Sequence, residues 1–177
     1  ICPYFIPGKK GVDLFRSLRA RGIRVVILSN SLASNDSVPM HVGYRRYRKD
    51  LLLAGVELWE LKPDVQLRVT AGKDHSSTKP KGTKTGSSLH AQSFVFDQRE
   101  LFVGSLNLDP HSAWLNTEMG LIIDIPKLAT QVKDDLESRL PEYAYRLEFV
   151  PGPGPCKTLG SIVLISQKNG KEVAYTN

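Results

Sequence analysis

The chain has 177 residues, of which 41% are hydrophobic and 24% charged, and its formal net charge is +6. This length suits one domain with a substantial core, and the composition is that of an ordinary globular protein. Two cysteines are too few for a disulfide framework, no Cys-x-x-Cys pair indicates zinc, and neither a signal peptide nor a membrane-spanning run is visible. Because the chain begins without Met, we expect it to be a fragment of a longer protein.

The first third of the chain predicts alternating strands and helices. In order, the pattern predicts a strand (1–6), a helix (9–20), a strand (23–28), a helix (40–54) and a strand (56–61). Gly22 and Gly55 follow the two helices, and glycine is the usual residue just beyond a helix end. Strands joined through single helices with short connections run parallel, so these strands should form a parallel sheet.

Polar segments separate these elements. Residues 29–39 form a turn-rich loop at the carboxyl end of a predicted strand, which is the edge where open α/β sheets bind ligands. The second helix carries a basic run that we interpret as a solvated face, while contact with anionic headgroups or nucleic acid remains the alternative. That run consists of Arg45, Arg46, Arg48 and Lys49. Residues 62–87 are rich in Gly, Ser, Thr and Lys, and predict a long mobile loop that could cover a site as a lid.

The rest of the chain predicts antiparallel strands and one long helix. In order, these are strands over 89–96, 101–105 and 117–124, a helix over 126–140, and weaker strands over 145–150, 161–166 and 171–175. Residues 97–100 join the first two strands as a hairpin, and Asn169-Gly170 predicts a second hairpin. The sequence therefore predicts an α/β fold with a mixed parallel and antiparallel sheet flanked by helices.

Polar residues with phosphate chemistry gather around two of these strands. His90 and Gln92 lie two apart on one predicted strand and so share a face, and Ser105 and Asn107 close the next strand. A hydroxyl and an amide can donate to phosphate oxygens, and a neutral histidine can attack phosphorus. Glu118, in an otherwise apolar strand, could fix the tautomer of His90. Each residue alone has a structural interpretation, but the fixed spacing of the set favours a phosphodiester site.

The spacing resembles the signature of the phospholipase D superfamily. His90-x-Gln92, four residues, Asp97, six residues and Gly104-Ser105-x-Asn107 match a family pattern in which a lysine occupies the position of Gln92. The longer segments HVGYRRYRKDLLLAGVELWEL and FVGSLNLDPHSAWLNTEMGLIID are similar to the second half of bacterial cardiolipin synthases. The resemblance covers nearly the whole chain and weakens after Pro151.

The resemblance implies a fold, a reaction and a set of roles. It implies a phospholipase D-like half over residues 1–150, with residues 151–177 as a β extension of the same domain. His90 and Glu118 would be catalytic, and Gln92, Ser105 and Asn107 would bind phosphate. Asp97 is expected to hold the hairpin turn and Gly104 to be structural. The implied chemistry is transfer of a phosphatidyl group through a phosphohistidine, without a metal or an organic cofactor.

The resemblance also implies partners. The donor would be a phospholipid like phosphatidylglycerol and the acceptor an alcohol, at the bacterial cytoplasmic membrane, with the protein bound peripherally. Since the family places one motif in each of two halves, the missing half or a second copy of the chain would complete the site. His41 and His111 have no motif around them and are poor substitutes for the second histidine.

Gln92 is the departure from the family pattern. A glutamine can donate to a phosphate oxygen but supplies no positive charge, and losing one such stabilising group costs a rate factor on the order of 10² to 10³. The change could be engineered, natural and attenuating, or the mark of a half that has lost catalysis. Two alternatives to the transferase therefore stay open: a dimeric single-motif phosphodiesterase or nuclease, for which nucleic acid is the less favoured partner, and a non-catalytic lipid-binding half.

Overall fold

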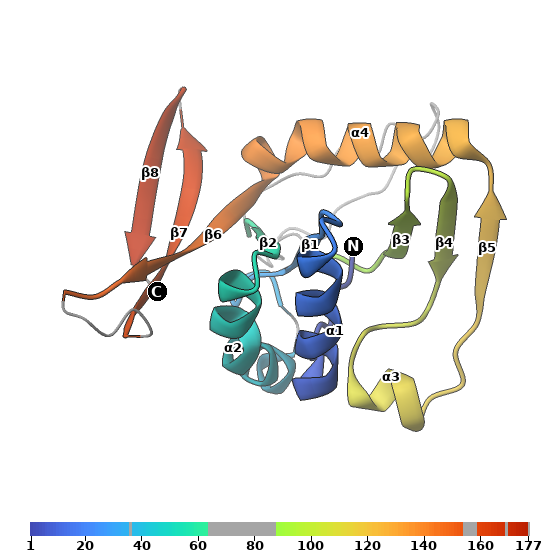
Figure 1. The fold of residues 1–177 in the computed structure, drawn as a ribbon, viewed down its shortest axis with the longest axis horizontal. Coiled ribbons are helices and arrows are strands. Elements are labelled where there is room, and N and C mark those ends of the chain that lie inside the picture. Colours follow the sequence, from blue (N-terminus) through green and yellow to red (C-terminus); the bar gives the residue numbers. More distant parts are fainter. Residues whose placement is uncertain (36, 64–87, 154–158, 169, 177) are drawn as a thin grey trace, which may run out of the picture.

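The structure is a computed structural model that describes residues 1–35, 37–63, 88–153, 159–168 and 170–176, in which helices flank two β-sheets (Figure 1). One sheet has the strand order β1-β2-β6-β7-β8, and the other has the order β3-β4-β5. The elements are α1 (Gly8–Ala20), β1 (Val26–Asn30), α2 (Val38–Leu53), β2 (Glu57–Leu61), β3 (Gln92–Phe96), β4 (Glu100–Gly104), α3 (Pro110–Trp114), β5 (Gly120–Asp124), α4 (Pro126–Tyr143), β6 (Ala144–Pro151), β7 (Gly160–Lys168) and β8 (Lys171–Thr176). The predicted α/β class with a mixed sheet is confirmed.

The parallel unit is formed by β1, α2 and β2. Val26 pairs with Glu57 and Asn30 with Leu61, in parallel register. The helices α1 and α2, which precede β1 and β2, end as predicted. Gly22 and Gly55 follow them with φ values of +80° and +84°, which glycine reaches without a steric penalty. The strand predicted over residues 23–28 begins three residues later, at Val26. The N–H of Ile23 instead caps α1 by donating to the carbonyl of Leu18.

Residues 1–6 do not form the predicted strand. Among the described residues, the only β-bridge of this segment is a single parallel one, between Phe5 and Leu108. Pro3 has no N–H to contribute to a ladder, which explains why regular pairing fails. The segment instead lies between the two sheets: the Cys2 N–H donates to the carbonyl of Leu28 in β1, and the backbone groups of Ile1 and Ser93 exchange two hydrogen bonds.

The antiparallel part contains the predicted hairpin of β3 and β4. Gln92 pairs with Gly104 and Phe96 with Glu100, and β5 pairs with β4 on its other side. Asp97 and Gln98 occupy the turn with φ values of +51° and +55°, a conformation that suits the primed turns of hairpins. The strand predicted over 89–96 begins only at Gln92.

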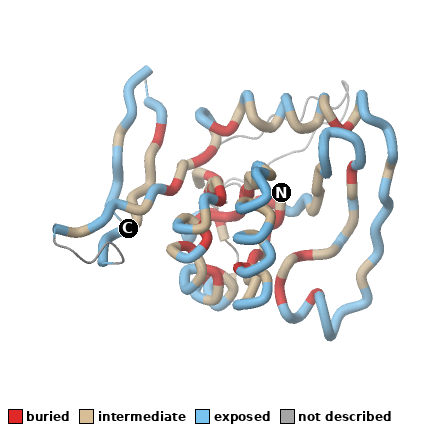
Figure 2. Tube along the Cα trace, viewed as in Figure 1, coloured by how far each residue is buried: buried red, intermediate tan, exposed pale blue. Residues whose placement is uncertain are grey.

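The helix α4 crosses above both sheets and leads into β6 (Figure 1). Of its predicted apolar face only Leu140 is fully buried, while Leu128, Val132 and Leu136 are half-buried. The strands β6, β7 and β8 continue the first sheet, and β7 and β8 form an antiparallel hairpin in which Lys168 pairs with Lys171. Figure 2 shows that this hairpin is mostly exposed or half-buried, whereas the buried residues concentrate around β1, β2 and the helices beneath them.

The basic run on α2 is not uniformly solvated as predicted. Arg48 is 2% exposed and pairs with Glu60 at 2.6 Å, in the core between α2 and β2. The same guanidinium lies 2.9 Å from Nε2 of His41 and 5.0 Å from the ring centre of Tyr44. The positive charge of Arg48 is therefore not available to a ligand at the surface, because it compensates the buried carboxylate of Glu60.

Three sequence predictions lie outside the described residues or cross their limits. The predicted mobile loop falls almost entirely within residues 64–87, and Cys156 and Asn169 also lie outside the described ranges. Lys62, at the start of that loop, is described: its amine donates to the carbonyls of Pro141 and Glu142 at the end of α4.

Candidate active site

Polar residues from three parts of the chain line one open depression of about 450 Å³. They come from the amino-terminal segment, the start of α2, and the segment that runs from the end of β4 through α3 to β5 (Figure 1). The lining residues are Tyr4, Ser37, Met40, Ser105, Asn107, Asp109, His111, Ser112, Asn116 and Glu118. Three residues predicted from the motif, namely Ser105, Asn107 and Glu118, thus share one surface.

Asn107 is the buried anchor of this surface. Its side chain is 7% exposed, and its Oδ1 accepts a hydrogen bond from the backbone N–H of Tyr4 at 3.1 Å. Cys2 contributes next to it, because its sulfur accepts from the N–H of Leu108. The side chain of Asn107 therefore joins the end of β4 to the amino-terminal segment.

Gln92 lies directly beside Asn107. Its hydrogen-bond partners assign the orientation of its amide: the NH₂ group donates to the carbonyls of His90 (2.9 Å) and Gly104 (3.3 Å), and the oxygen accepts from Nδ2 of Asn107 (3.1 Å). The side chain at the position of the family lysine is thus occupied by contacts within the protein. It links β3, β4 and Asn107 as a neutral bridge.

Ser105 and Glu118 form a second pair. The hydroxyl of Ser105 donates to Oε2 of Glu118 and accepts from the N–H of Met119, and Asn116 donates to Oε1 of Glu118. These bonds stabilise the charged carboxylate, so the pKa of Glu118 lies below its ordinary value, mainly because of Ser105 and then of Ser112 and Asn116. The carboxylate is an anion at neutral pH that faces solvent.

His90 lies apart from this pair. It is exposed, lies two residues before the start of β3, and is absent from the lining of the depression. Within the described residues its imidazole makes no hydrogen bond to Glu118, whose oxygens are held by Ser105 and Asn116. The structure therefore connects the backbone of His90 to the motif through Gln92, and the predicted contact between the His90 ring and Glu118 is not formed.

The two remaining motif residues have clear local surroundings. Asp97 lies in the β3–β4 turn, at the opposite end of β3 from His90. Gly104 pairs with Gly120 across β4 and β5, and a Cβ atom at Gly104 would meet the carbonyl oxygen of Met119 and would lie 2.8 Å from the ring of Phe102. Only glycine fits where the strands and this ring approach so closely.

The sequence interpretation missed Asp109 and underestimated His111. Asp109 is 5% exposed and caps α3 by accepting from the N–H groups of His111 (2.8 Å) and Ser112 (3.3 Å). An aspartate followed by proline is a recognisable start of a helix, so the signal was present in Asp109-Pro110. His111 lines the depression, whereas His41 is buried against Arg48.

The depression is polar, and its charged side chains are negative. Its lining offers hydroxyl, amide and imidazole groups together with two carboxylates, and among the described residues that line it there is no lysine or arginine. Throughout the described ranges, the depression included, no group of three His, Cys, Asp or Glu side chains is placed to hold a metal ion.

Comparison with known proteins places these observations in a family. The family model described as cardiolipin synthase, PLD-like domain matches residues 1–140. Cardiolipin synthase C of Escherichia coli K12 is 44% identical over 129 residues, which are 73% of this chain and 26% of that protein. An uncharacterized protein of Helicobacter pylori J99 is 37% identical over 172 residues, which are 97% of this chain and 32% of that protein. The chain thus spans about a quarter to a third of the length of these relatives.

A solved structure has the same fold. Nuc from Salmonella typhimurium, a phospholipase D family member, superposes with a TM-score of 0.51 over 77% of this chain and 73% of its own, at 16% sequence identity. The similarity confirms the fold expected from the motif.

Proposed function

Because this chain belongs to the cardiolipin synthase family with its PLD-like domain, we propose that it forms one half of an enzyme that transfers a phosphatidyl group between alcohols. Homology to cardiolipin synthases supports phosphodiester transfer on phospholipids in general. The observation that carries the specific proposal is the convergence of Ser105, Asn107 and Glu118 on one depression, to which the backbone of the motif histidine is linked through Gln92 and Asn107.

In the proposed reaction, a ring nitrogen of His90 attacks the phosphorus of a phospholipid diester. The bond from phosphorus to the leaving alcohol breaks, and that alcohol takes a proton from a general acid outside this chain's motif. The acceptor alcohol then attacks the phosphohistidine and loses its proton, the N–P bond breaks, and a new diester forms. No metal or organic cofactor takes part in these steps. The exposed imidazole of His90 supports this scheme. The Ser105 hydroxyl would exchange its bond to Glu118 for one to the substrate phosphate, and Asn107 would do the same with its bond to Gln92.

Residues 1–150 are proposed to form the catalytic half, with residues 151–177 as an extension of its sheet. A second half, or a second copy, is proposed to supply the general acid and the missing positive charge. Two observations support this need: Gln92 is neutral and engaged by three protein groups, and the described lining of the depression lacks lysine and arginine. Without a partner, charge on the transferring phosphoryl group would face Asp109 and Glu118 uncompensated, so we propose that the isolated chain is inactive.

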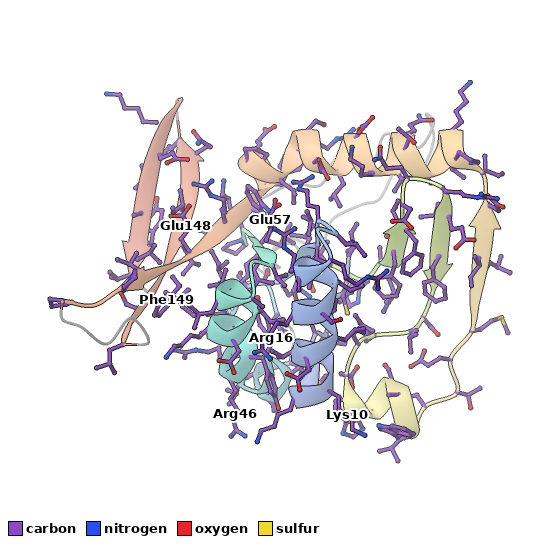
Figure 3. All side chains as sticks on the ribbon, in the orientation of Figure 1. Lys10, Arg16, Arg46, Glu57, Glu148 and Phe149 are labelled. Carbon is purple, nitrogen blue, oxygen red and sulfur yellow. The ribbon has the colours of Figure 1, made fainter. Side chains whose placement is uncertain are left out.

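Peripheral membrane contact is proposed for the side of the molecule that holds the depression. Trp114, Leu115 and Met119 flank it with exposed fractions of 84%, 73% and 81%, and tryptophan favours the membrane interface. Lys10 and Arg46 lie on the same side of the view as α3 (Figures 1 and 3), where they would attract anionic headgroups. Within the described ranges, none of the helices combines the length and hydropathy of a membrane crossing.

A non-catalytic lipid-binding half is the second candidate, and the hydrogen bonds of Gln92 favour it. The amide makes its contacts with His90, Gly104 and Asn107, which leaves it little capacity to hold a substrate phosphate. In this candidate the depression would bind a phosphate headgroup without cleaving it.

The test is lipid synthesis by the full-length protein. Vesicles containing phosphatidylglycerol are incubated with the natural protein and with the variants Gln92→Lys and Gln92→Lys/His90→Ala, and the products are separated by thin-layer chromatography. We expect Gln92→Lys to raise cardiolipin formation by a factor on the order of 10² and His90→Ala to abolish it. Absence of cardiolipin with Gln92→Lys, while vesicle binding persists, would favour the binding candidate and reject the transferase.

A further inference from the structure

We propose that Asn30 is a positioning residue for His90, acting through the backbone of Leu89. The inference rests on the proposed role of His90 as the nucleophile. Asn30 is the last residue of β1 and lies 59 positions before Leu89, so no motif around His90 includes it.

The side chain of Asn30 clamps both backbone groups of Leu89. Its Oδ1 accepts from the N–H of Leu89 at 2.9 Å, and its Nδ2 lies 3.4 Å from the carbonyl of the same residue. The side chain of Leu89 is itself 7% exposed and packs in a core cluster with Leu28, Leu61 and Leu140. The residue directly before His90 is therefore fixed by packing and by a buried amide.

A second clamp lies directly after this one. Gln92 donates to the carbonyl of His90, so side-chain amides hold the backbone on both sides of the histidine. Residues 89–91 lie outside the β3–β4 ladder, and both backbone groups of Leu89 and the carbonyl of His90 bond instead to side chains from β1 and β3. The imidazole itself stays exposed, so its position is set by its backbone.

Asn30 is in turn held rigidly. It is 1% exposed, and its backbone lies in the parallel ladder opposite Leu61. On α2, the ring of His41 is 1% exposed and accepts a hydrogen bond through Nε2 from Arg48, whose ionic partner is Glu60. Asn30 is therefore a buried carboxamide in a paired strand, a position that supports a fixed side-chain orientation.

Hydrogen exchange and kinetics of the full-length protein test the proposal. The variant Asn30→Leu removes both hydrogen bonds at similar volume, Asn30→Ser shortens the side chain beyond reach of Leu89, and Asn30→Asp keeps the acceptor for the Leu89 N–H. Ser29→Ala is the matched control, since Ser29 is equally buried in β1 but donates to the carbonyl of Pro3. Exchange is measured by mass spectrometry on peptides covering residues 88–92, and turnover is measured in the Gln92→Lys background.

We expect Asn30→Leu and Asn30→Ser to accelerate exchange at residues 88–92 by about fivefold or more relative to Ser29→Ala, the loss that one hydrogen bond predicts. In the same variants kcat should fall while KM stays constant. Asn30→Asp keeps the acceptor for the Leu89 N–H but loses the donor to its carbonyl, so it should accelerate exchange less than Asn30→Leu does. A purely structural role would lower thermal stability without separating kcat from KM. Equal exchange in the Asn30 variants and in Ser29→Ala overturns the proposal. A third outcome is faster exchange at residues 88–92 in the Asn30 variants alone, with no turnover in any variant. That outcome upholds the clamp and rejects the transferase function.

Discussion

Replacing Arg48 by methionine provides the sharpest test of the buried network. Arg48 and Glu60 are 2% and 1% exposed and pair at 2.6 Å, so the substitution leaves a buried carboxylate without its cation. Breaking one side of such a pair destabilises by about 3 to 5 kcal/mol. We expect a loss of this size in the free energy of unfolding at pH 8.

The loss of stability should depend on pH, because the pKa of Glu60 differs between the folded and unfolded states. Burial raises the pKa of Glu60 to about 7 in the folded protein, even though Arg48 lowers it. Between the unfolded value near 4.5 and the folded value, the folded state binds the extra proton, so stability falls as pH rises through that window. Without Arg48 the folded pKa rises further, and each additional pH unit costs about 1.4 kcal/mol.

At pH 5 the carboxyl of Glu60 is already protonated in the folded state of both the unmodified protein and the Arg48→Met variant. The variant should therefore lose about 1.4 kcal/mol less at pH 5 than at pH 8, as measured by urea denaturation. His41, whose pKa burial and Arg48 lower to about 4, should gain a proton more easily in the variant and reduce the loss at pH 5 further.

Two controls complete this experiment. Arg99→Met breaks an ion pair with Asp124 that is exposed on both sides, and it should change stability little at either pH. The double variant Arg48→Met/Glu60→Gln removes both charges and should be more stable at pH 8 than Arg48→Met alone. Equal losses for Arg48→Met at pH 5 and pH 8 would refute the assignment of a buried, titrating Glu60.

Three further predictions concern the region around the site. Gly104→Ala should lower the denaturation midpoint strongly, because the new Cβ meets the Met119 carbonyl and the Phe102 ring; an unchanged midpoint would contradict the close approach of β4 and β5. Asp109→Ala should cost about 1 kcal/mol in the free energy of unfolding, whereas Asp109→Asn should retain most of the cap, as chemical denaturation can measure. Trp114→Ala should weaken sedimentation with anionic vesicles and leave the melting temperature unchanged, because the side chain is 84% exposed; equal sedimentation would exclude α3 from the membrane contact.

Local signals in the sequence predicted much of the fold. Gly22 and Gly55 mark helix ends because their positive φ values are a local property, and the β3–β4 hairpin follows from two apolar strands joined by the short turn at residues 97–100. The strand predicted over residues 1–6 failed for two reasons: Pro3 cannot donate to a ladder, and an apolar run does not show that β1, Ser93 and Leu108 divide its backbone hydrogen bonds among them.

The site was predictable only in its composition. The spacing indicated that Ser105, Asn107 and Glu118 belong together, and they line one depression. The hydrogen bonds inside the set depend on tertiary distances that spacing does not encode, so the partner of Glu118 is Ser105 where His90 was expected. Burial of Arg48 was missed for a similar reason, since a basic run on a helix looks solvated until the acid opposite it on β2 is known.

The amino-terminal segment has a consequence for the order in which this protein can assemble. Ile1 bonds to Ser93, and Ile6 to Leu108, so these residues find their partners only after about a hundred more residues have been added to the chain. Contacts of such long sequence separation form late, because the intervening chain must close a large loop first. The seam between the sheets is thus expected to become ordered only after Leu108 has been added, and until then the edges of β1 and β3 remain open to pairing with other chains.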